Sequence, residues 1–166
     1  MKKFLWIVVA GWLAISIGRL SVADESPGEY SADAFATCSA CHLPDGAGVP
    51  GAFPPIRNRA ATIAGLDGGR DYLITVVTYG LMGTIKVDGM QYFGVMAGNT
   101  GAMTADDIAA ALNYVVFELN DADSSGIELF AAEEVEKVQT GITQKSPAAA
   151  GQLRSELVSK HGDKWP

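Results

Sequence analysis

The hydrophobic positions of this 166-residue chain fall into two kinds of pattern. The first is an uncharged apolar run over residues 4–17, which follows the basic start Met1-Lys2-Lys3. This run is shorter than the roughly 20 residues that cross a bilayer, and the small residues of Ser21-Val22-Ala23 follow it as a cleavage site. The pattern predicts a signal peptide over residues 1–23, and the alternative is a membrane anchor that is not cleaved.

The second pattern is helical, with apolar residues recurring three and four positions apart. It predicts helices over residues 31–40, 70–81 and 104–120, with Ser31 as the N-cap of the first and Thr104 as the start of a capping box in the third. The third helix carries a long apolar stripe, made of Ile108, Ala111, Leu112, Val115, Val116 and Leu119. We therefore expect a helical core in which this stripe is buried.

Two stretches lack the helical period. Residues 84–93 contain Asp88-Gly89 between apolar positions, which predicts a small β-hairpin. Residues 43–60 are neither helix nor strand, because they are rich in glycine and proline: Pro44, Gly46, Gly48, Pro50, Gly51, Pro54 and Pro55. We expect a fixed loop there, and the alternative is a disordered linker.

The chain becomes more polar after residue 120, which predicts a domain over residues 24–120 and a C-terminal extension over residues 121–166. Ser146-Pro147 is typical of an N-cap followed by the first helical residue, and Gly162 of a helix end. The extension is either a solvated tail packed lightly on the domain or an arm that docks a partner. In both cases, removing residues 141–166 should leave the functional site unchanged.

Charge narrows the class of partner. The chain has 12 basic and 19 acidic residues, a net charge of −7. Loss of residues 1–23 removes three basic residues and no acidic one, which makes the net charge about −10. Such a surface disfavours nucleic acid and anionic lipid and favours a basic protein partner, although the charge also serves simply to keep an exported protein soluble.

Both cysteines and one of the two histidines lie within Cys38-Ser39-Ala40-Cys41-His42. A disulfide across so short a loop would restrain little of the unfolded chain. A thioredoxin-type site needs a βαβ pattern that is not predicted here, and a zinc site needs four ligands, whereas His161 stands alone in a polar tail. The spacing C-x-x-C-H in an exported chain indicates covalent haem c, with thioethers to Cys38 and Cys41 and with His42 bound to the iron.

The second axial position of such an iron needs a further ligand, for which the mature chain offers Met82, Met90, Met96 and Met103. Met82 closes a predicted helix, Met90 lies in the hairpin turn, and Met103 precedes a helix start. Met96 lies in a predicted glycine-bounded loop and is the preferred ligand, while the other three methionines and an open site remain alternatives.

From Cys38 to about Val135 the sequence resembles the class I monohaem cytochromes c, especially the periplasmic kind that serves bacterial dehydrogenases. The stretches that carry the resemblance are CSACHLPDGAGVPGAFPPI, YLITVVTYGLMG and VDGMQYFGVMAG. The resemblance implies an all-α fold of four to five helices around one haem, in which the last major helix crosses the first. It also places Met96 at the position of the axial methionine, although Ala97 stands where the family usually has proline.

The resemblance further implies that a proline carbonyl in the loop accepts the Nδ1–H of His42, with Pro54 the preferred residue and Pro50 the alternative. Phe35 stands three residues before the first cysteine, where the family commonly has its aromatic residue at four. Tyr92 and Phe93 are expected to wall the haem pocket. The segment LFAAEEVEKV resembles one that follows the last helix in dehydrogenase-linked members.

These features predict an electron carrier in the periplasm, either freely diffusing or held as the cytochrome subunit of a dehydrogenase, which passes electrons from the dehydrogenase to a terminal respiratory acceptor. The sequence has no nucleophile motif and no nucleotide-binding loop, so we expect no enzyme activity of its own. One alternative is a haem protein with a labile sixth ligand that binds small molecules or acts as a sensor. The other is a structural C-x-x-C domain without redox activity.

Overall fold

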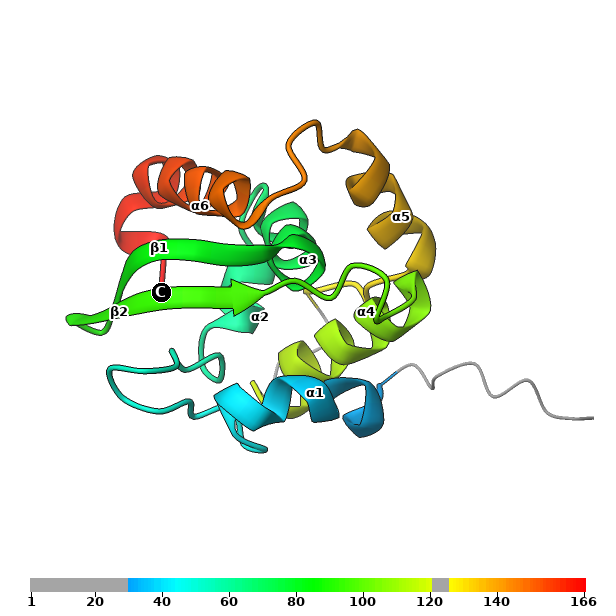
Figure 1. Ribbon diagram of the computed structural model, residues 1–166, viewed down its shortest axis with the longest axis horizontal. Coiled ribbons are helices and arrows are strands. Elements are labelled where there is room, and N and C mark those ends of the chain that lie inside the picture. Colours follow the sequence, from blue (N-terminus) through cyan, green and yellow to red (C-terminus); the bar gives the residue numbers. More distant parts are fainter. Residues whose placement is uncertain (1–29, 121–125) are drawn as a thin grey trace, which may run out of the picture.

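The computed structural model describes residues 30–120 and 126–166 of the chain (Figure 1). The predicted signal peptide, residues 1–23, lies outside the described residues. The described part contains six α-helices and one two-stranded antiparallel sheet, so it is mainly helical. Four of the α-helices lie before residue 121 and two after residue 125, which agrees with the four to five helices and the helical C-terminal extension that were expected. Within these two ranges, every helix is too short or too polar to span a bilayer.

Helix α1, Ala32–His42, begins at the predicted N-cap, where the Oγ of Ser31 accepts the backbone N–H of Ala34 at 3.0 Å. Phe35 is only 2% exposed and points into the core. The helix continues two residues past the predicted end and stops at Leu43, whose φ of 63° is left-handed. The cysteine–histidine motif therefore occupies the last turns of a helix that the core holds in place.

Helix α4, Ala105–Asn113, continues into a π-helical turn, Tyr114–Glu118, and the two together cover most of the predicted helix over residues 104–120. The predicted capping box is present. The backbone N–H of Asp107 donates to the Thr104 hydroxyl at 3.1 Å, and the Asp107 carboxylate accepts the backbone N–H of Thr104 at 2.9 Å.

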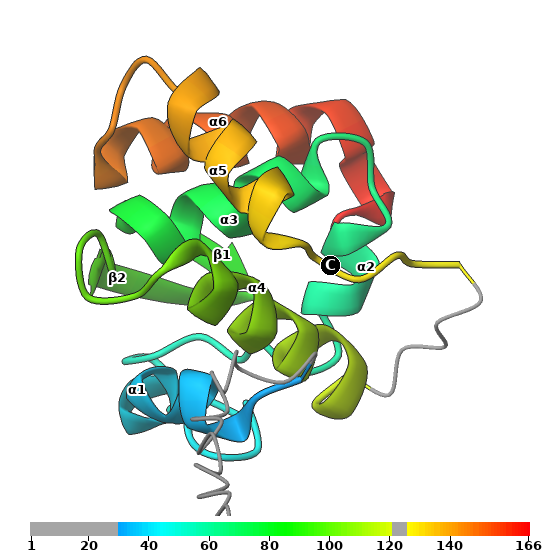
Figure 2. The ribbon, with the colours of Figure 1, turned by 90° about the vertical axis from the view of Figure 1, so that its right-hand side faces the viewer.

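Helices α1 and α4 pack against each other at the centre of the core (Figure 2). The rings of Phe35 and Tyr114 lie 5.4 Å apart at this crossing. On α4, the small side chains of Ala109, Ala110 and Ala111 are each at most 5% exposed, which allows the close approach that the family resemblance implies.

Helices α2, Ala60–Ala64, and α3, Gly69–Tyr79, lie on the other side of α4 from α1 (Figure 2). A side chain at Gly69 would clash with a carbonyl oxygen of α2, so this glycine allows the two helices to approach. The predicted helix over residues 70–81 ends early, at Tyr79, because Gly80 adopts a φ of 84° and the chain enters a strand.

Strands β1, Gly80–Val87, and β2, Met90–Ala97, form the predicted hairpin. The turn residues Asp88 and Gly89 have φ values of 49° and 79°, as a two-residue type I′ turn requires. The hairpin is longer at both ends than the predicted range of residues 84–93. As a result, three of the four candidate methionines lie on strands rather than in a helix end or a loop.

Helix α5, Ala132–Gly141, is joined to the start of α3 by Arg70. The Arg70 guanidinium donates to both carboxylate oxygens of Glu134, at 2.7 and 2.5 Å, and to the carbonyl oxygens of Glu128 and Leu129. It also lies 3.8 Å from the centroid of the Phe130 ring. This cluster fixes the part of the chain that follows residue 125 against the helical core.

Helix α6, Pro147–His161, begins and ends as the sequence predicts. The Ser146 Oγ accepts the backbone N–H of Ala149 at 3.3 Å, Pro147 is the first helical residue, and Gly162 ends the helix with a φ of 53°. A short 3₁₀ turn, Gly162–Lys164, leads to Trp165.

Helix α6 packs along strand β1 (Figure 1). A Cβ at Gly151 would lie 2.8 Å from the carbonyl oxygen of Met82, and Nη2 of Arg154 donates to the carbonyl oxygen of Lys86 at 3.2 Å. The helix therefore covers an edge of the sheet that would otherwise leave backbone groups unpaired. Because Leu157 is also buried, at 4% exposure, the expectation of a lightly packed tail is wrong for this segment.

Candidate haem site

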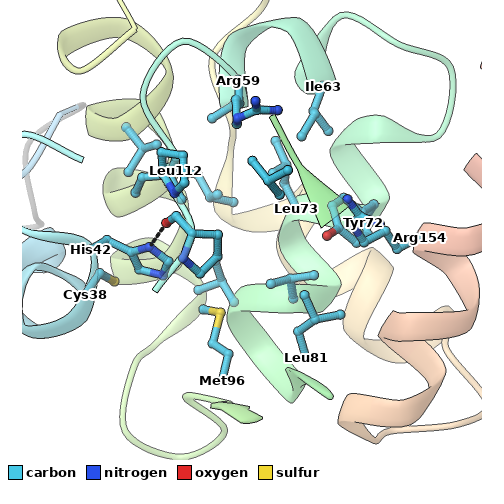
Figure 3. A pocket seen from close by; sticks show the side chains of 18 of the residues that line it. Cys38, His42, Arg59, Ile63, Tyr72, Leu73, Leu81, Met96, Leu112 and Arg154 are labelled. Atoms are coloured by element: carbon cyan, nitrogen blue, oxygen red, sulfur yellow. Dashed lines mark hydrogen bonds between the residues drawn. The ribbon is translucent and has the colours of Figure 1, made fainter. Parts of the chain in front are cut away.

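One cavity lies between α1, α3, the hairpin and α6 (Figure 3). It is partly open to solvent and extends from the end of α1 to the C-terminal segment. Most of its lining is apolar and includes Ile63, Leu73, Val77, Leu81, Ile85 and Leu112. A flat, largely apolar macrocycle suits a cavity with this lining.

The last turns of α1 bring Cys38 to this cavity. Cys38 is half-buried and lines it, whereas Cys41 is exposed. The two thiols are three residues apart on one helix, so both lie on the same side of α1. Burial raises the pKa of the Cys38 thiol above its usual value, which is the opposite of the activated thiolate of a redox C-x-x-C motif.

His42 is the last residue of α1, and it is only 7% exposed. Its Nδ1 donates a hydrogen bond to the carbonyl oxygen of Pro54 at 2.9 Å, so the bond expected at Pro54 is present. The bond assigns the proton to Nδ1 and leaves the lone pair on Nε2 available to a metal. Burial lowers the pKa of His42, with the bond to Pro54 acting in the other direction, and so favours the neutral ring.

The loop that carries Pro54 is fixed by its own backbone hydrogen bonds. The N–H of Gly48 donates to the carbonyl oxygen of His42 at 2.9 Å, and Val49 pairs with Phe53. Gly48 has a φ of 66°, and a side chain at this position would clash with the carbonyl oxygen of Phe53. The expectation of a fixed loop is therefore confirmed, and the alternative of a disordered linker is wrong.

Met96 also lines the cavity, but it does so from strand β2. Its expected position in a glycine-bounded loop is wrong, because the longer hairpin pairs Met96 with Leu81 of β1. Figure 3 shows the Met96 side chain reaching into the same cavity as the His42 ring.

The other candidate methionines of the described chain do not line the cavity. Met82 lies on β1 rather than at a helix end, and it is 49% exposed; Met90 opens β2 and is 43% exposed. Met103 packs against the hydrophobic core. Position alone therefore separates Met96 from the three alternatives.

The hairpin contributes different side chains from those expected. Leu81, Ile85 and Val87 of β1 line the cavity together with Met96, whereas Tyr92 and Phe93 do not. Phe93 is 83% exposed, because neighbouring residues of a strand point to opposite faces and this one points outward. The expectation that Tyr92 and Phe93 wall the pocket is wrong.

Polar groups reach the cavity on the side away from Cys38, from Arg59, Tyr72 and Arg154 (Figure 3). Arg59 is 9% exposed and forms an ion pair with Asp88 of the hairpin turn. Burial raises the pKa of Tyr72 to about 12, while the neighbouring Arg154 acts in the opposite direction. The cavity thus combines apolar walls with two guanidinium groups.

The fold and the site together define a c-type cytochrome: a helical core, a C-x-x-C-H motif at the end of the first helix, and a buried apolar cavity beside it. The comparisons with known proteins agree. The cytochrome c family model matches residues 29–116, which is more than half of the chain. The chain belongs to the cytochrome c family, as a class I monohaem member.

Two relatives match a longer part of the chain than the family model does. A cytochrome c-552 of Thermus thermophilus is 44% identical over 124 residues, which cover 74% of this chain and 80% of that protein. Another cytochrome c-552 from Thermus thermophilus is 44% identical over 106 residues, which cover 63% of this chain and 80% of the relative. The cofactor is therefore one haem c, attached covalently through Cys38 and Cys41, and the protein is an electron carrier.

Sequence reasoning missed Arg59, Tyr72, Arg154 and Trp165 as residues of the cavity. Tyr72 belongs to an apolar stripe that predicts core packing, while Arg154 lies in the polar extension. A usable signal is the pair Leu153 and Leu157, spaced as one face of a helix and therefore requiring a surface to pack on. That signal predicts packing, but it does not identify the cavity.

Proposed function

We propose that the protein is an exported, periplasmic electron carrier in which His42 and Met96 bind the two faces of the haem iron. One observation carries the proposal: the His42 imidazole and the Met96 thioether reach the same apolar cavity from different elements. Haem supplies the one-electron exchange between Fe(II) and Fe(III) when it is bound. The residues around it set how readily that exchange occurs.

Each ligand has a distinct role in this proposal. The hydrogen bond from Nδ1 of His42 to Pro54 holds the imidazole in one orientation and increases its basicity. A thioether ligand favours the reduced iron, so ligation by histidine and methionine raises the reduction potential relative to two histidines. With both axial positions filled and an apolar lining that excludes water, electrons transfer without a small molecule binding to the iron.

Electrons enter and leave through the haem edge beside Cys38 and Cys41. Support comes from the exposure of Cys41, which stands one turn after Cys38 on α1. The net charge of −7, or about −10 after loss of residues 1–23, favours a basic redox partner. We propose residues 1–23 as the export signal, residues 24–120 as the cytochrome domain and residues 121–166 as its C-terminal extension.

The donor is a dehydrogenase in this proposal, either as a separate partner or as a complex that includes this chain. Isolating the native protein from a periplasmic fraction by its haem absorbance, and identifying what elutes with it, tests that assignment. Electron exchange with a basic partner should slow as the ionic strength rises. A rate that does not depend on salt would contradict the charge argument.

The ligand assignment is tested with carbon monoxide. The reduced wild-type protein and the control Met82→Ala should not bind carbon monoxide at neutral pH, because the sixth position is filled. Met96→Ala should bind it rapidly and should have a lower reduction potential. Rapid binding by the wild-type protein would favour a ligand-binding or sensor function, and an unchanged Met96→Ala spectrum would exclude Met96 as the ligand.

A further inference from the structure

Arg154 of helix α6 has its charge unmatched within the described structure. Its guanidinium donates to the carbonyl oxygen of Lys86 at 3.2 Å and lies 5.7 Å from the centroid of the Trp165 ring, but it forms no ion pair with any described carboxylate. It is half-buried and lines the cavity. Arg59, the other guanidinium of the cavity, is already paired with Asp88.

Two further polar groups surround the Arg154 side chain. Tyr72 of α3 is 5% exposed, and Arg154 is the side chain that offsets part of the effect of burial on its pKa. Trp165 packs on Tyr72 with ring centroids 5.5 Å apart, and it also lines the cavity. A guanidinium, a phenol hydroxyl and an indole N–H are all hydrogen-bond donors, so this corner of the cavity suits an anion.

No carboxylate side chain lines the cavity in the described part of the chain. Haem c carries two propionate carboxylates at the edge opposite the two carbons that form thioethers. Figure 3 shows Tyr72 and Arg154 across the cavity from Cys38. A macrocycle attached at α1 and lying in the cavity therefore points its propionate edge toward these donors.

We propose that Arg154 binds one haem propionate, with Tyr72 and Trp165 as further hydrogen-bond donors. The inference rests on the proposed function, because it requires the haem to lie between His42 and Met96. Arg154 and Trp165 both lie beyond residue 116, where the match to the family model ends. The C-terminal extension is then part of the cofactor site.

Removing the Arg154 charge should change the redox equilibrium. A positive charge near the haem disfavours the oxidised iron. The Arg154 guanidinium also offsets the negative charge of the propionate, which would otherwise stabilise the oxidised iron. In Arg154→Gln the ratio of reduced to oxidised protein at a fixed potential should fall about threefold to tenfold, or about 30–60 mV at 59 mV per factor of ten. Arg154→Lys should recover most of this loss.

The pH profile separates ion pairing from a structural effect. Loss of Arg154 raises the pKa of the propionate, so the potential of Arg154→Gln should fall as the pH rises through that pKa, whereas the wild-type potential should stay level over the same range. The charged and titratable groups of the residues that line the cavity are those of Cys38, His42, Arg59, Tyr72 and Arg154 and the terminal carboxyl group of Pro166, with Asp88 paired to Arg59.

Lys164→Gln is the matched control, since Lys164 is exposed, lies in the same C-terminal segment and does not line the cavity. It should leave both the potential and its pH profile close to those of the wild type. An equal shift in Lys164→Gln and Arg154→Gln would overturn the proposal. So would an Arg154→Gln protein with the wild-type potential and pH profile.

The position of the propionates can also be measured in the wild-type holoprotein, so this test does not depend on whether a variant folds. In the reduced, diamagnetic protein, nuclear Overhauser contacts should connect the methylene protons of one propionate with the rings of Tyr72 and Trp165. The proposal would be overturned if both propionates showed contacts with other residues and neither showed a contact with Tyr72 or Trp165. The Met96 ε-methyl resonance, shifted upfield by the porphyrin ring current, reports axial ligation separately, so failure of the propionate site and failure of the proposed ligation give different spectra.

Discussion

At the scale of single residues, the site depends on a few positions whose geometry leaves little freedom. His42 is held by one hydrogen bond to Pro54, and Pro54 is presented by a loop whose path passes through Gly48. Gly48 and Gly51 both have positive φ values, 66° and 77°, but only Gly48 lies against another part of the backbone. The loop therefore constrains Gly48 more strongly than Gly51.

Gly48→Ala should destabilise the protein more than Gly51→Ala. Both substitutions place a side chain at a positive φ, which costs about 1 kcal/mol in each case. A Cβ at position 48 also clashes with the carbonyl oxygen of Phe53, whereas at position 51 nothing lies within 4 Å. We expect an additional loss of about 1–3 kcal/mol in the free energy of unfolding for Gly48→Ala. Equal losses in denaturant titrations would contradict the packing of this loop.

Phe35 and Phe93 form a second matched pair, since the first is 2% exposed and the second 83%. Phe35→Ala should lower the free energy of unfolding by about 3–5 kcal/mol, because it leaves a cavity where α1 meets α4. Phe93→Ala should change it by less than about 0.5 kcal/mol. Thermal unfolding of the two holoproteins measures the difference, and a large loss in Phe93→Ala would show that its ring is not exposed in the folded protein.

At the scale of helices and strands, local signals predict most of the elements. Ser31, Thr104 and Ser146 are N-caps as their types and positions suggest, and Asp88-Gly89 forms the hairpin turn. Strand lengths are predicted less well. The apolar pattern of residues 80–83 predicts a helix end, but Gly80 and the pairing with residues 94–97 extend the sheet. Residues 80–83 form a strand because they pair with another strand, and the local hydrophobic pattern carries no information about that partner.

Dependence on long-range contacts also explains why only some of the residues that line the cavity could be predicted. The C-x-x-C-H motif and Pro54 are predictable because local spacing or the family resemblance specifies them. The position of Met96 on a strand, the outward direction of Phe93 and the arrival of Arg154 at the cavity depend on strand register and helix packing. Such long-range relations are not encoded in any short stretch of the sequence.

The N-cap of α4 gives a prediction that depends on pH. Thr104→Ala should lower the free energy of unfolding by about 1 kcal/mol at pH 7, because it removes the side-chain half of the capping box. Thr140→Ala, an exposed threonine within α5, is the control and should cost little.

Hydrogen bonds from the backbone and hydroxyl of Thr104 hold the pKa of Asp107 below its usual value of 3.8. A carboxyl with a depressed pKa in the folded state contributes stability above its unfolded-state pKa and loses it as the pH falls through the folded value. The difference in the free energy of unfolding between the wild type and Thr104→Ala should therefore become smaller below about pH 4. Urea titrations at pH 7 and in the acid range measure it, and a constant difference would contradict the role of the carboxylate.

At the scale of the whole molecule, helix α6 is a structural part of the cytochrome. Helix α6 covers the edge of β1, Leu157 packs with Ile63 and Tyr72, and the α6 end is held at Asp67 by Lys160 at 2.6 Å and by His161 at 2.9 Å. The described chain is thus one packed unit, with α6 on the opposite side of the hydrophobic core from α1 (Figure 2). The expectation that residues 141–166 are dispensable for the site does not fit this arrangement.

Deletion of residues 147–166 should change the haem environment. It removes Arg154, Trp165 and Pro166 from the cavity lining and exposes Ile63 and Tyr72 to water. We expect a lower reduction potential, an altered haem spectrum and a melting temperature lower by about 10 °C or more. Leu157→Ala should give a smaller loss of stability without the change in potential. A truncated protein with the wild-type spectrum and potential would support a tail that lies outside the site.

The central claim is that one covalently bound haem is held between His42 and Met96. The most direct measurement is the NMR spectrum of the reduced holoprotein with its methionine ε-methyl groups labelled with ¹³C. The account predicts one methyl resonance shifted far upfield by the porphyrin ring current, absent from Met96→Leu and present in Met82→Leu. An upfield resonance that persists in Met96→Leu, or a wild-type spectrum without one, would contradict it.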